Sequence, residues 1–202
     1  MLLRMLKTFS AFFLVPLCAV LCAVLAVLAG CQMIGGGKMQ LCTHTYALCT
    51  SALCVPQPGN TGKAICFCDV YEGRSMSTAP CENLRPETDA KGIRTIYSTF
   101  SYEQANAGQK VMKCPGGTPW TWCLNKKCTI DPTNPNQAIC LCDVVRSQES
   151  WITFGGDCAP ETCSTSYWSG ASIKDFNQAE NFMVRELNLN ASPIAWCEAD
   201  LQ

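Results

Sequence analysis

Two short stretches of the chain place cysteines one residue apart. They read "AICFCDV", Ala64 to Val70, and "AICLCDV", Ala138 to Val144. Such a pair can bind a metal as thiolates, exchange disulfides, or fasten one strand to two neighbours. Because residues i and i+2 of a strand lie on the same face, the two sulfurs of each pair point the same way. A bond between them would close a small, strained ring, so we expect each cysteine to bond to a different partner.

Metal and thiol chemistry find little support in the rest of the sequence. The chain contains 17 cysteines but no C-x2-C pair, the spacing typical of zinc sites and of thiol oxidoreductases. The single histidine, His44, cannot complete a mixed metal cluster, and any Ser-His-Asp or Cys-His unit would depend on it alone. We therefore expect no metal and no cofactor, and a surface position for His44.

A carboxylate follows each cysteine pair. Asp69 and Asp143 could act as general acid and base. Alternatively, each forms backbone hydrogen bonds at the end of a strand, a structural role that a duplication would copy. We favour the structural role and expect no enzyme activity, and we keep a carboxylate-dependent enzyme as the least favoured alternative.

The N-terminus indicates in which compartment the cysteines lie. Arg4 and Lys7 precede an uncharged apolar run that extends to Gly30, which is the pattern of a secretory signal. A run of roughly 20 apolar residues is also long enough to span a membrane. Pro16 makes a spanning helix less favourable because it removes a helix hydrogen bond.

The residues that end this run favour cleavage over spanning. The stretch "LAGC", Leu28 to Cys31, resembles the lipobox of bacterial lipoproteins. The resemblance implies that Cys31 becomes the mature N-terminus with a diacylated sulfur and an acylated amine, which would anchor the protein in the lipid bilayer. Gln32 stands where Asp signals retention in the inner membrane, so the resemblance implies the outer membrane if the source is Gram-negative. "GGGK", Gly35 to Lys38, is a flexible tether.

The cysteine count becomes even once the signal is removed. Without Cys18 and Cys22 in the signal and Cys31 on the lipid, fourteen cysteines remain, enough for seven disulfides in an oxidising envelope. They are Cys42, Cys49, Cys54, Cys66, Cys68, Cys81, Cys114, Cys123, Cys128, Cys140, Cys142, Cys158, Cys163 and Cys197. Removing Arg4 and Lys7 leaves 13 basic against 16 acidic residues, a weak charge that argues against nucleic acid as a partner.

The mature chain contains an internal repeat. A shift of 74 residues superimposes Cys49, Cys54, Cys66 and Cys68 on Cys123, Cys128, Cys140 and Cys142, and ten of the 22 positions from 49 to 70 are identical. The shared frame, C-x4-C-x11-C-x-C, is loosely similar to the cysteine-rich hairpins of follistatin and epidermal-growth-factor-like modules, a similarity too short to transfer a function. The sequence therefore predicts a tandem duplication: a signal peptide (1–30), a lipidated cysteine and tether (31–38), and cysteine-rich modules at 39–113 and 114–202.

Each module should contain a hairpin, an added strand and a helix. "PQPGNTG" and "DPTNPN" separate short apolar segments, which predicts hairpins with longer loops. "GIRTIYSTF" and "SWITFGG" have strand composition. Ser101 with Gln104 and Ser172 with Asp175 resemble capping boxes, and the helical spacing after Ser172 continues to about Leu187. The expected fold is α+β, made of small disulfide-rich tandem modules, with Cys163 bonded to Cys197.

The two modules differ in their tryptophans, all five of which belong to the second. Trp120 and Trp122 lie in a short loop, "CPGGTPWTWC", where the first module has "CTHTYALC". Tryptophan is enriched at binding hot spots and is also a large core residue. We expect core positions for most of the five, an exposed Trp120, and a binding role for Trp120 and Trp122.

These observations together predict an envelope-anchored lipoprotein without enzyme activity. Its duplicated modules would bind a protein or a glycan, or serve structurally, at the cell surface or in the periplasm. The alternative is an inhibitor of an extracytoplasmic hydrolase, because loops held by disulfides are preorganised to resist cleavage.

Overall fold

The computed structural model describes residues 37–154 and 167–196. The signal sequence, the lipobox with Cys31, and the cysteines Cys158, Cys163 and Cys197 lie outside the described residues, and so does the predicted Cys163–Cys197 bond. The described residues from Gly37 onward form one compact unit. Among the described residues, no helix combines the length and the hydropathy that crossing a bilayer requires.

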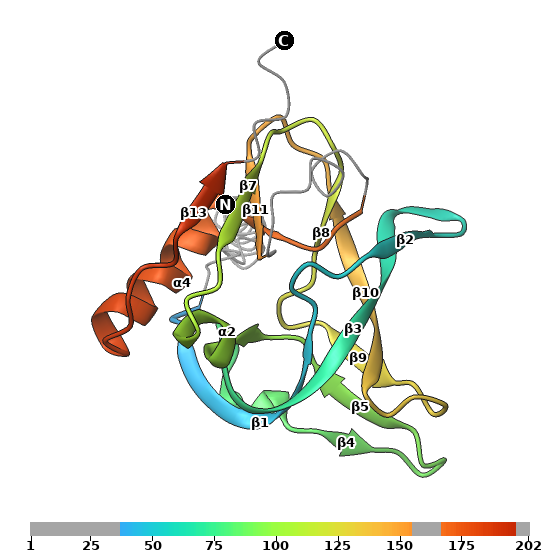
Figure 1. Cartoon of the computed structure of the whole chain (residues 1–202). Helices are drawn as coiled ribbons and strands as arrows, with labels where there is room; N and C mark the ends of the chain where they lie inside the picture. Colours follow the sequence, from blue (N-terminus) through green and yellow to red (C-terminus); the bar gives the residue numbers. More distant parts are fainter. Residues whose placement is uncertain (1–36, 155–166, 197–202) are drawn as a thin grey trace, which may run out of the picture. The chain divides into compact units, whose positions relative to one another are not determined.

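The larger of two sheets has nine strands among the described residues and is curled (Figure 1). Its strands follow one another in the order β1-β3-β10-β9-β5-β4; β2 and β6 also pair with β3, and β8 pairs with β10. The bounds are β1 Gln40–Leu48, β2 Cys54–Gln57, β3 Asn60–Ser77, β4 Glu87–Thr88, β5 Arg94–Tyr97, β6 Phe100–Ser101, β8 Trp120–Trp122, β9 Lys127–Ile130 and β10 Gln137–Val145.

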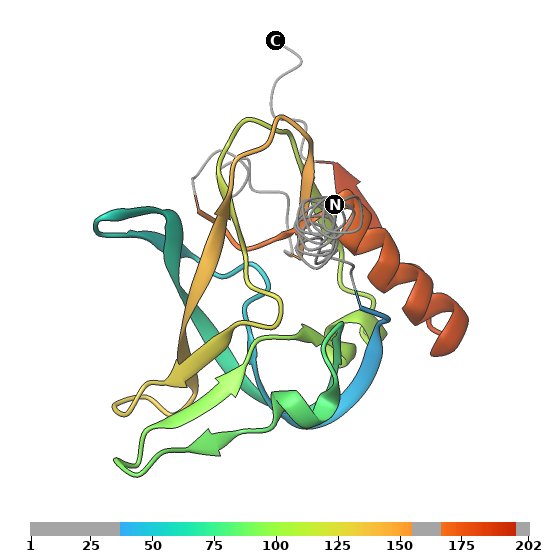
Figure 2. The ribbon, with the colours of Figure 1, turned by 180° about the vertical axis from the view of Figure 1, so that it is seen from behind.

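A four-stranded sheet and short helices complete the described fold. The sheet order is β12-β11-β7-β13, with bounds β7 Val111–Cys114, β11 Trp151–Phe154, β12 Ala171–Ser172 and β13 Ile194–Trp196. The helices are the 3-10 turn η1 (Cys81–Leu84), α2 (Tyr102–Asn106) and α4 (Ile173–Glu186). Two opposite views place α4 and the β2–β3 hairpin on opposite sides of this unit (Figures 1 and 2).

The fold is mostly β with several disulfides and few helices, so the expectation of a disulfide-rich α+β fold is confirmed in part. The described α-helices contain only 5 and 14 residues, whereas β3 alone contains 18. The reason lies in the cysteine-pair segments, where buried side chains alternate with less buried ones with a period of two, which is the pattern of a strand and not of a helix. The added strands predicted after each hairpin are confirmed as β5, β6 and β11.

Both predicted helix starts are confirmed. The Ser101 hydroxyl accepts a hydrogen bond from the Gln104 amide at 3.2 Å, and the Ser172 hydroxyl accepts one from the Asp175 amide at 3.1 Å. Each bond satisfies an amide that the first helical turn leaves without a backbone partner. The chain therefore begins both helices with the same serine cap.

The longer helix packs as its periodicity predicts. Phe176, Ala179 and Met183 recur at helical spacing and are buried, so these three side chains form the inner face of α4. The helix ends at Glu186 with Leu187 as its C-cap, where the spacing predicted the end.

The first hairpin turns more tightly than expected. Only Pro58 and Gly59 separate β2 from β3, because Gly59 adopts a φ of +75°, which a turn with proline before glycine requires. The second hairpin has the longer loop that was predicted, residues 131–136 between β9 and β10.

The two cysteine-pair strands lie side by side at the centre of the large sheet. β3 and β10 are antiparallel, and Cys66 lies directly opposite Cys140. Their other neighbours pair in matching registers: Ala47 of β1 is opposite Val70, and Thr121 of β8, 74 residues after Ala47, is opposite Val144. Strands from both predicted modules thus belong to a single sheet, in which β10 and β9 of the second lie between β3 and β5 of the first.

Two serines link the two predicted modules, 39–113 and 114–202, which are called the two halves from here on. The Ser98 hydroxyl donates to the carbonyl of Cys123, and the Lys126 amide donates to the Ser98 hydroxyl at 3.2 Å. In the same way, the Ser169 hydroxyl donates to the carbonyl of Cys49 and accepts from the Ala52 amide at 3.0 Å. Each half therefore holds the turn after the first cysteine of the other half.

Candidate binding face

Four disulfides form the inner side of the central sheet. They join Cys49 to Cys68, Cys54 to Cys66, Cys123 to Cys142 and Cys128 to Cys140. The sequence separations are 19 and 12 residues in both hairpins. All eight cysteines are buried in one cluster. The expectation that the two sulfurs of each C-x-C pair bond to different partners is confirmed.

Two further observations extend the disulfide framework. Cys42 bonds to Cys81 and so fastens β1 to η1, and Cys114 is disulfide-bonded as well. Closed disulfides are consistent with an oxidising compartment.

Sulfurs of different disulfides also approach one another. Cys49 Sγ lies 3.4 Å from Cys140 Sγ, and Cys123 Sγ lies 3.6 Å from Cys66 Sγ. Two sets of three cysteine sulfurs lie close enough together to hold a soft metal if they were thiolates. The sets are Cys49, Cys68 and Cys140, and Cys49, Cys123 and Cys142. In the closed disulfides, however, no thiolate is present to act as a ligand. The cluster thus serves as packing and cross-linking for the sheet.

The repeated carboxylates lie far apart on the sheet. Asp143 is opposite Lys63 on β3, whereas Asp69 is six residues further along β3, opposite Gln137. At the strand rise of about 3.3 Å per residue this separation is about 20 Å. One acid–base pair cannot include both.

Asp143 has a structural environment. It forms ion pairs with Lys63 and Lys126. Burial by itself raises the pKa of Asp143, but the hydrogen bonds and charges of Lys126 and Lys63 outweigh burial, so that the pKa lies below its ordinary value. The carboxylate is thus held ionised between two strands and a turn, which fits a cross-link better than a general acid.

His44 lies within β1 and is partly buried rather than fully exposed. Its Nε2 lies 3.3 Å from the Ser75 hydroxyl, and its Nδ1 lies 2.9 Å from the Thr45 carbonyl. Ser75 is completely buried, at 0% exposure, so a substrate cannot reach it as a nucleophile. This serine–histidine contact is therefore structural.

The expected exposure of Trp120 is wrong. Its side chain is 4% exposed and stacks on Trp151, with ring centroids 5.9 Å apart. β8 directs Trp120 into a cluster that strands of the smaller sheet complete with Met112 and Cys114. The loop pattern could not predict this because the covering residues lie elsewhere in the sequence. Trp122 packs against the same cluster and remains partly exposed.

The outer side of the central sheet carries a regular set of apolar side chains, five of them exposed and one, Ile65, half-buried. Because side chains alternate along a strand, the residues between the buried cysteines point outward. Strand pairing aligns them in two rows. One row is Leu53, Phe67 and Ile139, and the other is Val55, Ile65 and Leu141. Phe67 and Leu141 are both 42% exposed.

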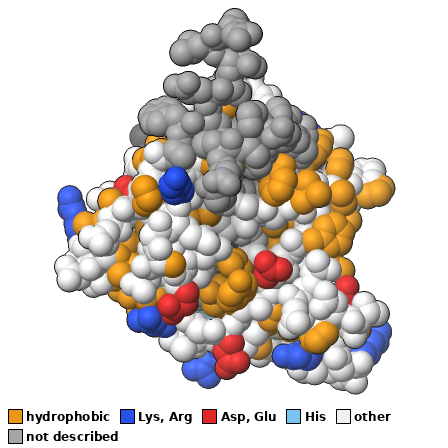
Figure 3. Space-filling model, viewed as in Figure 1, with side chains coloured by type: hydrophobic (Ala, Val, Ile, Leu, Met, Phe, Trp, Pro, Cys, Tyr) orange, Lys and Arg blue, Asp and Glu red, His pale blue; other side chains and the backbone are white. Residues whose placement is uncertain are grey.

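Both rows continue into polar residues on β9 and β5. Ile139 is opposite Thr129, which is opposite Thr95. Beside these, Lys127 is opposite Tyr97 and forms an ion pair with Glu87 at 2.7 Å. The outer face, defined here as these two rows with their polar continuation, is therefore apolar where the rows cross β2, β3 and β10 and polar over β9, β5 and β4. The Lys63–Asp143 ion pair lies beside the second row. Hydrophobic side chains gather where β2, β3 and β10 lie (Figure 3).

Sequence reasoning missed this face, although a signal for it was present. The residues between the two cysteines of each pair, Phe67 and Leu141, are both large and apolar. Since the cysteines face the core, a large apolar residue between them must face outward.

No family model, no curated protein and no solved structure matches the chain.

Proposed function

We propose that this protein is a lipid-anchored binding protein of the bacterial cell envelope, which holds a partner protein against its outer face. The observation that carries the proposal is the pair of apolar rows on a sheet whose opposite side is cross-linked by four disulfides. Contiguous exposed apolar patches of a few hundred Å² commonly mark interaction sites. A sheet cross-linked from behind loses little conformational entropy when a partner binds.

The proposal includes a duplicated architecture. The 74-residue spacing of equivalent cysteines, the identical disulfide separations and the matching strand registers all support two copies of one unit. In this arrangement Ile65 and Phe67 of one copy correspond to Ile139 and Leu141 of the other. The centre of the outer face thus consists of the same two positions from both copies.

The chemistry of the face favours a protein over a glycan. The two rows contain six apolar side chains with one aromatic ring, Phe67, and no charged group. Such a surface gains from burial against another apolar surface, whereas it offers few hydrogen bonds to sugar hydroxyls. The polar continuation with Lys127 would form the rim of the interface.

A photo-crosslinking experiment in the native membrane tests the proposal. A benzophenone amino acid would replace Phe67, and the matched control would carry it at Val184 of α4, which is also an exposed apolar position. We expect a discrete cross-linked protein from position 67 and none from position 184. A Leu141→Ser substitution in the same chain should abolish that product, because it removes a neighbouring apolar contact.

Three outcomes would contradict the proposal. They are the same products from both positions, no product from position 67, and a product that persists in the Leu141→Ser chain. Mass spectrometry of the cross-linked species also separates a different protein from a second copy of this chain, and only the former agrees with the proposal. Unchanged thermal unfolding of the Leu141→Ser protein would confirm that the fold is intact.

A further inference from the structure

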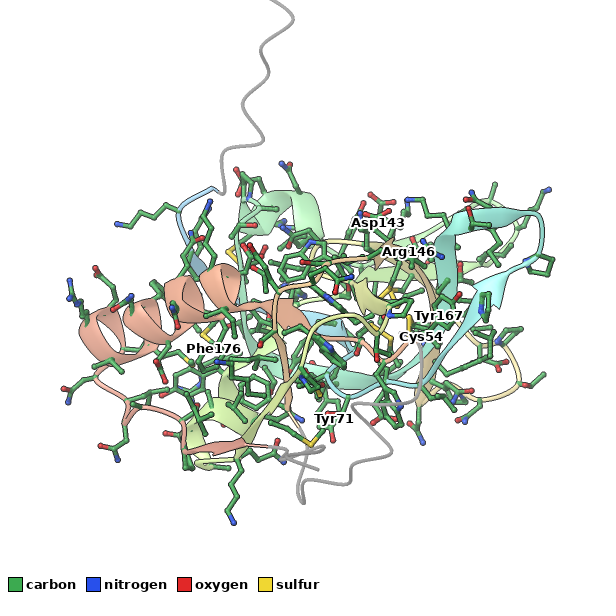
Figure 4. All side chains as sticks on the ribbon, turned by 90° about the horizontal axis from the view of Figure 1, so that it is seen from above. Cys54, Tyr71, Asp143, Arg146, Tyr167 and Phe176 are labelled. Atoms are coloured by element: carbon green, nitrogen blue, oxygen red, sulfur yellow. A yellow bond between two sulfur atoms is a disulfide. The ribbon has the colours of Figure 1, made fainter. Side chains whose placement is uncertain are left out.

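A cavity lies between the two sheets and α4, separate from the outer face. Equivalent residues of the two halves contribute to its lining, among them Cys49 with Cys123 and Thr99 with Gly170. Phe176, Ala179 and Met183 of α4 also line it, and Phe176 lies on the side of α4 that faces the strands (Figure 4). The cavity volume is about 50 Å³, several times the roughly 10–15 Å³ that one water requires.

Among the described residues that line the cavity, none carries an ionisable carboxylate, amine, guanidinium or imidazole group. Most of it is apolar, and the polar groups are hydroxyls, one amide side chain and backbone. Moving a charged molecule into such surroundings would cost far more free energy than moving a neutral one, because no opposite charge is available to pair with it. The cavity therefore selects against charged molecules.

One buried hydroxyl in the lining has no hydrogen-bond partner in the described part of the chain. Thr99 is 3% exposed, and its Oγ1 forms no hydrogen bond with the described residues. By contrast, the hydroxyls of Ser98, Ser101 and Ser169 in the same lining are hydrogen-bonded. A buried hydroxyl without a partner is unfavourable, and a ligand oxygen would remove that penalty. The equivalent position in the other half is Gly170, which has no side chain to fill the space.

We infer that this cavity binds a small, uncharged molecule with an apolar body and one hydroxyl or carbonyl oxygen, which forms a hydrogen bond with Thr99. The apolar body would lie against α4, next to Ala179, where the side chain of the helix is shortest. Small-molecule sites commonly have this composition, a mainly apolar lining with a few polar groups that fix orientation. The inference does not depend on the outer face or on the lipid anchor.

The test uses three probes of similar size with the full chain in lipid nanodiscs. Benzyl alcohol has the apolar body and the hydroxyl, toluene lacks the hydroxyl, and benzoate carries a charge. Binding would be measured by calorimetric titration. The control is Ala179→Leu protein, whose larger side chain fills the cavity, so that the heat it gives reports only the probe that partitions into lipid. We expect benzyl alcohol to bind the wild-type protein more tightly than toluene does, and benzoate not to bind.

A second variant tests the role of Thr99 without changing the cavity volume. Thr99→Val replaces the hydroxyl by a methyl group of similar size. It should weaken benzyl alcohol binding by about 3- to 10-fold, the range that one neutral hydrogen bond gives, and leave toluene binding unchanged. Binding of benzoate as tight as that of benzyl alcohol, equal loss of both neutral probes in Thr99→Val, or no binding of any probe to the wild-type protein would overturn the inference.

Discussion

Cys66 and Cys140 lie directly opposite each other on neighbouring antiparallel strands, yet they are not bonded to each other. Each is instead disulfide-bonded to the strand on its other side, Cys66 to Cys54 and Cys140 to Cys128. A row of four cysteines thus crosses β2, β3, β10 and β9. Among the described residues, the central strand pair is therefore joined by backbone hydrogen bonds and the Lys63–Asp143 ion pair but by no disulfide, and the disulfides link the flanking strands β2 and β9 to it.

Removal of one of these disulfides should destabilise the fold substantially. We expect the double substitution Cys128→Ala with Cys140→Ala to lower the free energy of unfolding by about 2–5 kcal/mol, the range for native disulfides in small secreted domains. Both cysteines are buried, so the loss of packing adds to the loss of the cross-link. Denaturant unfolding would measure the change. A decrease below about 0.5 kcal/mol, within the range of ordinary surface substitutions, would contradict this prediction.

The intact mass of the protein from its own membranes tests the anchor and the oxidation state together. We expect a mass that begins at Cys31 with acyl chains added, and no alkylation until a reductant is supplied. Cysteines that alkylate without reductant would contradict the closed framework. A mass that retains residues 1–30 would instead support an uncleaved anchor.

Asp143 should contribute a pH-dependent part of the stability. Its pKa is lowered in the folded protein because Lys126 and Lys63 outweigh the effect of burial. The contribution is therefore complete above the unfolded pKa of about 3.9 and is lost as the pH falls through the lower folded value. We expect Asp143→Asn to lower stability by up to about 1 kcal/mol near neutral pH, as for other exposed ion pairs.

Unfolding free energies from pH 2 to 7 would measure the Asp143 effect. The difference between wild-type and Asp143→Asn protein should shrink toward zero at the acid end. Asp69→Asn is the matched control because Asp69 occupies the equivalent place in the other hairpin, opposite Gln137 instead of a lysine. If Asp69→Asn and Asp143→Asn lowered the free energy of unfolding equally, the stability that we assign to the two ion pairs of Asp143 would be contradicted.

The reciprocal serines make a prediction about amide exchange. Ser98→Ala removes the hydroxyl that accepts from the Lys126 amide, and Ser169→Ala removes the one that accepts from the Ala52 amide. We expect each substitution to cost about 1–3 kcal/mol, because a buried carbonyl or amide loses a partner. Hydrogen exchange should accelerate mainly at the turn of the opposite half. Faster exchange confined to the substituted half would contradict the link.

Local patterns predicted much of the fold, but not the partners of each element. The short apolar segment after a turn signal predicted the strand of Cys66 and Cys68, and their two-residue spacing predicted separate disulfide partners. Ser101 and Ser172 predicted the helix starts. None of these patterns specifies which strand lies next to β3, since strand pairing depends on contacts between residues far apart in sequence. For the same reason the burial of Trp120 against β11 and β7 could not be foreseen, and neither could a cavity lined by both halves.

The dependence on contacts between residues far apart in sequence also limited what could be predicted of the candidate site. The outward direction of Phe67 and Leu141 follows from their own strands, but their place within one continuous face follows only from the β3–β10 pairing. The unpartnered hydroxyl of Thr99 carries no sequence signal at all, because a threonine in a short apolar stretch reads as an ordinary strand residue.

The interleaving of the two halves bears on how such a molecule could have arisen. A shorter chain with only one half would leave the central edge of its β3 unpaired, and its turn would lack the serine that the other half supplies. Two identical copies of that chain would meet both needs at once, around a true twofold axis. If the two halves are copies of one unit, as proposed above, the present protein is a fused homodimer in which each half has been free to acquire its own side chains, as at Thr99 and Gly170.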